Sequence, residues 1–244
     1  MGLILESYWD QMNKKAWKMN LKRMKAILII MLVMIMTSGC ASKETEGRAA
    51  CQNLYNIVML AHENTTQMAS EVIGMYELGK DGSFKYEDVK RTVSLSDAEI
   101  KQGVIDVLND VLPDLGVESH LKDRSAGEAF MMYTALPALS KSYTGDNYFS
   151  ASNVLVTITA YKRTDTYANA KKYMEAAQAQ VDMIKENYPE CKEYDETYKY
   201  YYAVRNLLYE YGEIGNSYLT MDSLQNFLND AAERKESAEA LLFQ

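Results

Sequence analysis

Apolar residues recur at alternating steps of three and four along the segment from residue 47 to residue 79. The positions of this seam are Cys51, Leu54, Val58, Ala61, Thr65, Met68, Val72, Met75 and Gly79. This spacing over about four heptads is typical of a helix that packs along one side against other helices. The glycine-rich stretch GKDGS follows. The pattern therefore predicts a long helix from about residue 47 to residue 79.

Two shorter helical patterns follow the first. Ser96 and Glu99 have the spacing of a capping box, so we expect a helix over residues 97–112, which a proline and a glycine then close. A second apolar segment covers residues 122–142. A proline inside it is expected to kink or shorten that helix.

The helical pattern resumes near Tyr148 and stops before Pro189. The sequence KRTDT interrupts it midway, because Thr164 or Asp165 can cap a fresh helix. Heptad spacing then returns over residues 194–241. These patterns place most of the chain in helices.

No segment of the sequence shows the alternation of a strand, and the whole chain has only three prolines. A β-sandwich of this size would need more turn signals at short spacing. We therefore predict an all-α fold, an antiparallel bundle of four to six helices, with residues 48–244 as one domain. A short helical-repeat array is the alternative, but the sequence shows no internal period near 34 residues.

An uncharged apolar stretch of eleven residues, Ala26 to Met36, lies near the N-terminus. As a helix it would be roughly 17 Å long, whereas the hydrocarbon core of a bilayer is roughly 30 Å thick. Lys22, Arg23 and Lys25 precede it, and small residues follow it. This is the order of a secretory signal, so we expect export.

The last four residues of this region, Thr37-Ser38-Gly39-Cys40, resemble the lipobox of bacterial lipoproteins. The resemblance covers residues 19–40 and implies that the peptide bond before Cys40 is cut. It also implies that the Cys40 sulfur carries a lipid with fatty acyl chains such as palmitate, which anchors the protein to the outer face of a membrane. Residues 1–39 would then be an upstream extension and signal peptide, and residues 40–47 a lipidated tether. An uncleaved anchor or an ordinary signal peptide is the alternative.

The segment that begins at Cys40 is acidic. Of the 26 basic and 34 acidic residues in the chain, six basic and two acidic residues precede Cys40, which leaves a net charge of −12. Such a charge argues against nucleic acid as a partner and against broad adhesion to anionic lipid. An envelope protein or a small ligand remains as the expected partner.

Two cysteines remain after Cys40, at Cys51 and Cys191. In an exported protein they could form a disulfide, provided that their Cα atoms lie within roughly 7 Å of each other. If four helices alternate in direction, the two cysteines lie at opposite ends of the bundle. If the segments at 97–112 and 122–142 form a hairpin of their own, both cysteines lie at the same end. The pattern leaves both arrangements open.

Residues that would carry metal or cofactor chemistry are scarce. The two histidines, His62 and His120, occur in no zinc or di-iron motif, and no phosphate loop, dinucleotide fingerprint or serine elbow is present. His62 lies next to the seam of the first helix, and we interpret it as a residue at the edge of the core. We therefore predict no metal, no cofactor and no catalytic residue.

Tyrosine is the distinctive residue of this chain. Eight of the 18 tyrosines after Cys40 lie between Tyr194 and Tyr218. Because four of them cannot share the inward stripe of one helix, we predict a ligand or partner surface at Tyr200, Tyr202, Tyr209 and Tyr211. The alternative is that the tyrosines fill a wide bundle interior.

Two functions are compatible with these features. The first is a membrane-anchored extracytoplasmic lipoprotein that acts without catalysis as a binding or scaffold module for an envelope protein or a small ligand. The second is a cell-envelope hydrolase that acts on wall or glycan material through a pair of carboxylates. A tyrosine-lined groove would favour the first, and two carboxylates in one cleft the second.

Overall fold

Helices make up the regular structure of the residues that the computed structural model describes, which are 42–80, 82–134, 148–213 and 221–243; no strand occurs in these ranges. The α-helices are α2 (Lys43–Gly79), α3 (Tyr86–Thr92), α4 (Asp97–Val111), α5 (Val117–Leu121), α6 (Ala126–Thr134), α7 (Tyr148–Tyr161), α8 (Asp165–Asn187), α9 (Tyr194–Glu213) and α10 (Met221–Leu242). A 3-10 turn, Pro113–Leu115, joins α4 to α5. The predicted all-α helical bundle is confirmed, and Gly47–Gln244 forms one compact unit.

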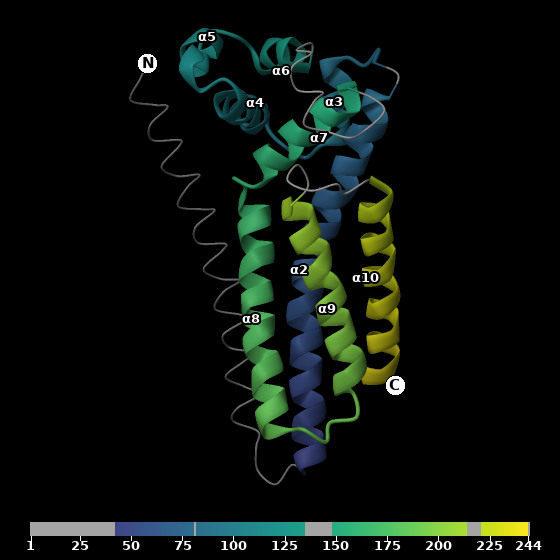
Figure 1. The fold of residues 1–244 in the computed structure, drawn as a ribbon. Coiled ribbons are helices and arrows are strands. Elements are labelled where there is room, and N and C mark those ends of the chain that lie inside the picture. The colour runs from purple at the N-terminus through teal and green to yellow at the C-terminus, as the bar shows by residue number, and fades with distance from the viewer. Residues whose placement is uncertain (1–41, 81, 135–147, 214–220, 244) are drawn as a thin grey trace, which may run out of the picture. The chain divides into compact units, whose positions relative to one another are not determined.

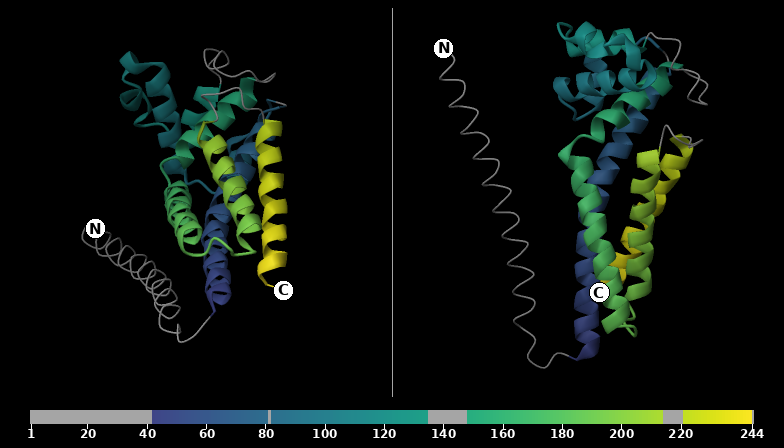
Figure 2. Two further views of the ribbon diagram at one scale, coloured as in Figure 1. Left: turned by 60° about the horizontal axis from the view of Figure 1, so that its bottom comes forward. Right: turned by 60° about the vertical axis from the view of Figure 1, so that its left-hand side comes forward.

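Four long helices, α2, α8, α9 and α10, lie side by side and alternate in direction (Figures 1 and 2). Hydrogen bonds join α2 to each of the other three, in the pairs Ala50–Gln180, His62–Tyr200 and Tyr55–Glu239. All nine residues of the predicted seam on α2 are buried. The heptad pattern therefore marks the side of α2 that faces the other long helices.

The shorter helices α3, α4, α5 and α6 lie at the end of the bundle where α2 ends, and α7 leads from them into α8 (Figure 1). Helices α4 and α7 approach closely at Gly103. A Cβ atom on Gly103 would lie 2.8 Å from the Cβ of Ala160, too close for a side chain. Glycine at this position thus allows the two helices to pack together.

The predicted helix starts at Ser96 and Thr164 are confirmed. Ser96 Oγ accepts a hydrogen bond from the Glu99 backbone N–H at 3.3 Å, and the Ser96 backbone N–H donates one to Glu99 Oε2 at 2.7 Å. Thr164 Oγ1 likewise accepts from the Tyr167 backbone N–H at 3.4 Å. Each cap satisfies an N–H group that the first helical turn leaves without a partner.

Other boundaries differ from the prediction. Helix α2 begins at Lys43, so residues 43–47, which were predicted as part of a tether, are helical. The negative charges of Glu44 and Glu46 in the first turn stabilise the helix, because its N-terminal end carries a partial positive charge. The predicted segment 122–142 begins instead at Ala126, because Ser125 and Glu128 form a further reciprocal cap. Helices α3 and α5 were not predicted, and residues 135–147 lie outside the described part.

Candidate functional site

The four tyrosines predicted as one surface separate into two groups on α9. Tyr202 and Tyr209 are 48% and 64% exposed, whereas Tyr200 and Tyr211 are fully buried. The prediction was therefore wrong for Tyr200 and Tyr211, because the rotation of about 100° per residue turns them towards the bundle interior. For these two the alternative reading, tyrosines that fill the core, is correct.

Tyr200 belongs to a buried polar contact. Its hydroxyl lies 2.8 Å from Nδ1 of His62, and the rings meet edge to face with centroids 5.5 Å apart. Burial, with a smaller contribution from the Lys235 ammonium, lowers the pKa of His62 to about 4, and burial raises the pKa of the Tyr200 phenol. Both groups are neutral near pH 7, so the contact is a hydrogen bond within the core.

The two exposed tyrosines lie in different hollows, one on each side of α9. Tyr209 lies in a groove of about 470 Å³ between α8 and α9. Its charged, polar and aromatic lining residues are Tyr167, Lys171, Glu175, Gln178, Tyr201, Arg205 and Tyr209. We name it the α8–α9 groove.

The α8–α9 groove combines aromatic rings with two exposed cations. Lys171 Nζ lies 5.8 Å from the centroid of the Tyr167 ring, and the Tyr201 hydroxyl donates to Gln178 Oε1 at 2.6 Å. Within the described residues, neither Lys171 nor Arg205 has a carboxylate within ion-pair distance. Cations that no carboxylate of the described residues neutralises in an ion pair can attract an anion.

On the other side of α9, Tyr202 lines a hollow of similar volume, about 470 Å³, between α9 and α10. Its two cations are already paired: Lys199 with Glu196 and Arg234 with Asp230. We name it the α9–α10 hollow. A carboxylate beside each cation weakens the attraction for a second anion.

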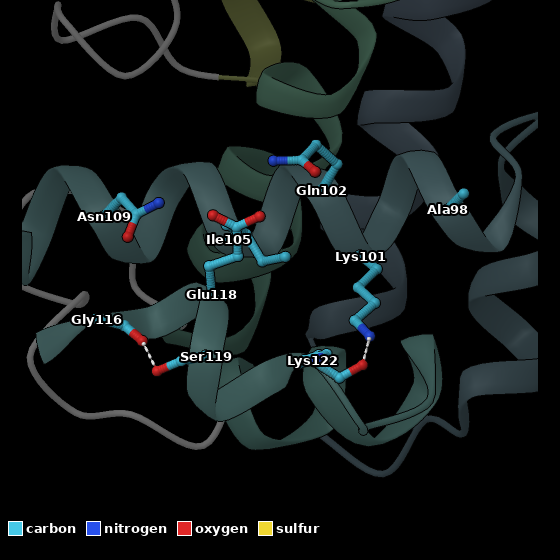
Figure 3. A pocket seen from close by; sticks show the side chains of 9 residues that line it. All are labelled: Ala98, Lys101, Gln102, Ile105, Asn109, Gly116, Glu118, Ser119 and Lys122. Carbon is cyan, nitrogen blue, oxygen red and sulfur yellow. Dashed lines mark hydrogen bonds between the residues drawn. The ribbon is translucent and has the colours of Figure 1, made fainter.

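A larger hollow, of about 800 Å³, lies between α4 and α5 (Figure 3). Its polar groups largely bond to the helices around it: Lys101 Nζ donates to the carbonyl oxygen of Lys122 at 3.0 Å, and Ser119 Oγ to that of Gly116 at 2.8 Å (Figure 3). None of its lining residues is aromatic. Despite its size, it offers fewer groups for recognition than the α8–α9 groove.

Glu71 accepts several hydrogen bonds that connect separate parts of the fold. Glu71 of α2 accepts hydrogen bonds from the Ser94 backbone N–H at 2.6 Å, from Ser94 Oγ at 2.7 Å and from the Tyr161 hydroxyl. It thereby ties the segment before α4 and the end of α7 to α2. The Glu71 carboxylate therefore holds the fold together at this point.

Three carboxyl groups have a pKa below the ordinary value, the opposite of a glycosidase-type general acid. At Asp88 and Glu128 a backbone N–H group donates to the ionised form, and at Asp97 the Lys90 ammonium does so. No cluster of three or more metal-ligating side chains occurs in the described ranges. His120 lies in α5, outside any such cluster.

Cys51 and Cys191 meet at the end of the bundle opposite the short helices. Their sulfur atoms are 2.9 Å apart, and both side chains are thiols in the structure. The short helices keep the chain at the end where α2 finishes, so α8 runs back antiparallel to α2 and α9 starts at the same end as α2 (Figure 1). The four long helices alternate in direction, but Cys191 precedes the third of them rather than the fourth, because residues 194–241 contain two helices, α9 and α10. Of the two arrangements left open by the sequence, the structure has the second.

Sequence reasoning missed Lys171 and Arg205 as site residues. Each looks like an ordinary charge on the solvent face of a helix, and whether it finds a partner depends on the register of α8 against α9. Cys40 and the apolar stretch before it lie outside the described residues. Within the described ones, no helix has both the length and the apolar character that a bilayer span requires.

Comparison with protein-family models, curated proteins and solved structures finds no match for this chain. Function must therefore be inferred from the sequence motifs and from the geometry of the α8–α9 groove.

Proposed function

We propose that this chain is a lipid-anchored, extracytoplasmic binding module without catalytic activity. Its α8–α9 groove binds a ligand that carries a carboxylate beside an aromatic or apolar group. The observation that carries this proposal is the pair of cations, Lys171 and Arg205, that line the groove beside the exposed ring of Tyr209 and form no ion pair with the described residues.

The chemistry of the groove supports this ligand class. A guanidinium group such as that of Arg205 presents two parallel N–H donors, which match the two oxygens of a carboxylate. The Tyr209 ring offers apolar area and a hydroxyl at low entropic cost. A volume of about 470 Å³ falls in the range of about 300–1,000 Å³ that small-molecule sites occupy.

Titration of the full-length protein in detergent with N-acetyltyrosine and phenylacetate, and with the corresponding neutral amides, tests the groove. Wild type should bind the carboxylates and not the amides. The double variant Lys171→Gln with Arg205→Gln should lose about tenfold or more in affinity, because each charge-assisted hydrogen bond contributes about 1.5–3 kcal/mol.

The α9–α10 hollow provides the matched control. Lys199→Gln with Arg234→Gln removes the same total charge from the other side of α9 but should change the affinity less than about twofold. Equal losses in both double variants would show that only net charge matters. That result, or no binding of any carboxylate tested, would refute the groove as the site.

The anchor is tested separately. The lipobox resemblance predicts that protein extracted from membranes begins at residue 40 and carries acyl chains on Cys40. Cys40→Ser should remain in the precursor form without lipid. An intact mass that shows residue 40 unacylated and still joined to residue 39 would contradict the anchor, whatever the groove binds.

A further inference from the structure

The contact between Cys51 and Cys191 joins parts of the chain that are 140 residues apart. Cys51 lies near the start of α2 and is completely buried, and Cys191 is half-buried in the connection between α8 and α9. Their 2.9 Å separation is shorter than the contact of two unbonded sulfur atoms and longer than the S–S bond of about 2.0 Å. A small movement of either side chain would bring the sulfurs to bonding distance.

The surroundings hold the two thiols at this place from several sides. Arg48 of α2 pairs with Glu193 at 3.7 Å, one turn from the thiols, and its guanidinium also donates to the carbonyl oxygen of Leu242 in α10 at 3.0 Å. A Cβ atom on Gly47 would lie 3.4 Å from the Cβ of Cys191, so the backbone of α2 passes close to the α8–α9 connection. The thiols therefore lie where α2, α10 and this connection meet.

We propose that Cys51 and Cys191 form an intramolecular disulfide, which fastens the start of α2 to the connection between α8 and α9. The bond forms by thiol–disulfide exchange with a small disulfide or a disulfide oxidoreductase of the extracytoplasmic space. One cysteine sulfur attacks that disulfide, forms a mixed disulfide and releases the first sulfur of the oxidant. The other cysteine then attacks the cysteine sulfur of the mixed disulfide and displaces the second sulfur of the oxidant. Two electrons pass to the oxidant, and its two sulfurs leave as thiols with the two protons. Formation of the disulfide in the cell depends on the proposed export, because a reducing cytoplasm would keep both thiols free.

Burial also raises the pKa of the Cys51 thiol, with the nearby Cys191 and Glu193 contributing in the same direction. The attacking species is the thiolate, so exchange is slow once the thiols are buried. The bond is therefore expected to form while the chain folds.

The test uses the full-length chain in two arms. In the first arm, purified protein is unfolded with reductant and refolded in a mixture of reduced and oxidised glutathione. In the second, thiols of intact cells are trapped with acid and N-ethylmaleimide. Tryptic peptides that contain Cys51 and Cys191 should be recovered as one linked species in both arms. Separate alkylated peptides in the first arm would refute the pairing.

Free thiols in cells, in protein whose Cys40 is acylated, would refute the bond while leaving the proposed anchor intact. Reduction should lower the melting temperature of wild type by about 5–15 °C, because the bridge closes a long loop. The double variant Cys51→Ala with Cys191→Ala should not respond to reductant. An unchanged melting temperature on reduction of the linked wild type would overturn the stabilising role.

Discussion

The α8–α9 groove and the α9–α10 hollow flank the same helix, have similar volumes of about 470 Å³, and each contains an exposed tyrosine and two cations. They differ in the ion pairs that the cations form. Lys199 and Arg234 in the α9–α10 hollow are paired with carboxylates one turn away. Glu175 also lines the groove, but Lys171 and Arg205 form no ion pair with it or with any other carboxylate of the described residues. Volume and residue types alone do not distinguish the two sites as candidates for anion binding. The ion pairs of the cations do.

The side of α9 that faces the bundle interior also carries tyrosines, and these are buried. Tyr200 and Tyr211 contribute apolar area and, for Tyr200, a hydrogen bond to His62. A tyrosine-rich helix can therefore serve the core and the surface at once. The following predictions test this division, from the largest expected effect to the smallest.

Truncation of a tyrosine should have very different effects on the two sides of α9. Tyr200→Ala removes a fully buried ring and should cost about 3–5 kcal/mol of unfolding free energy. Tyr209→Ala removes an exposed ring and should change stability by less than about 0.5 kcal/mol. Chemical denaturation measures both, and similar losses would contradict the separation of core from surface.

The core side should also be sensitive to acid through His62. Its pKa in the folded protein is about 4, below the ordinary 6.5, so the unfolded chain binds a proton first as the pH falls. Stability is therefore lost between about pH 6.5 and pH 4, by roughly 3 kcal/mol in total. His62→Gln, which cannot titrate, should show a correspondingly flatter dependence in denaturation at each pH. Parallel curves for the two proteins would refute a neutral buried histidine.

Two substitutions should give the α9–α10 hollow the unpaired cations of the α8–α9 groove. Glu196→Gln with Asp230→Asn removes the carboxylates that pair with Lys199 and Arg234. We expect the variant to gain a second, weaker carboxylate site, with an affinity within about tenfold of the groove. Isothermal titration with N-acetyltyrosine reports the number of sites, and a stoichiometry that stays at one would show that charge pairing is not what distinguishes the two.

The smallest effect concerns the exposed rings. Tyr209→Ala should weaken carboxylate binding about two- to twelvefold, since an aromatic contact contributes about 0.5–1.5 kcal/mol beyond its area. Tyr202→Ala should leave it unchanged. Equal weakening by both variants in the same titration would argue for an unspecific aromatic surface.

The repeating features of this fold could be predicted from the sequence. The seam of α2 and the caps at Ser96 and Thr164 are local patterns, and a helix displays them wherever it is placed. Helix α3 was missed because its one buried residue, Val89, gives no periodicity. The start of α2 was placed late because its first turns, which carry Glu44 and Glu46, look like a polar tether.

The site was less accessible to sequence reasoning because it depends on the angle between helices. Tyr202 and Tyr209 could be identified as exposed candidates, but Tyr200 and Tyr211 could not be distinguished from them without the rotation of α9. The pairing of Lys199 with Glu196 follows local spacing. Whether Arg205 forms an ion pair depends on how α8 and α9 pack, and among the described residues it forms none.

A photoreactive phenylalanine analogue placed at position 209, and in a second protein at position 202, tests the central claim most directly in intact cells. After irradiation, mass spectrometry measures the adduct on each purified protein. The account predicts an adduct at position 209 that disappears when Lys171 and Arg205 are both changed to glutamine, and none at position 202. Equal adducts at both positions, or an adduct at position 209 that persists without the two cations, would contradict it.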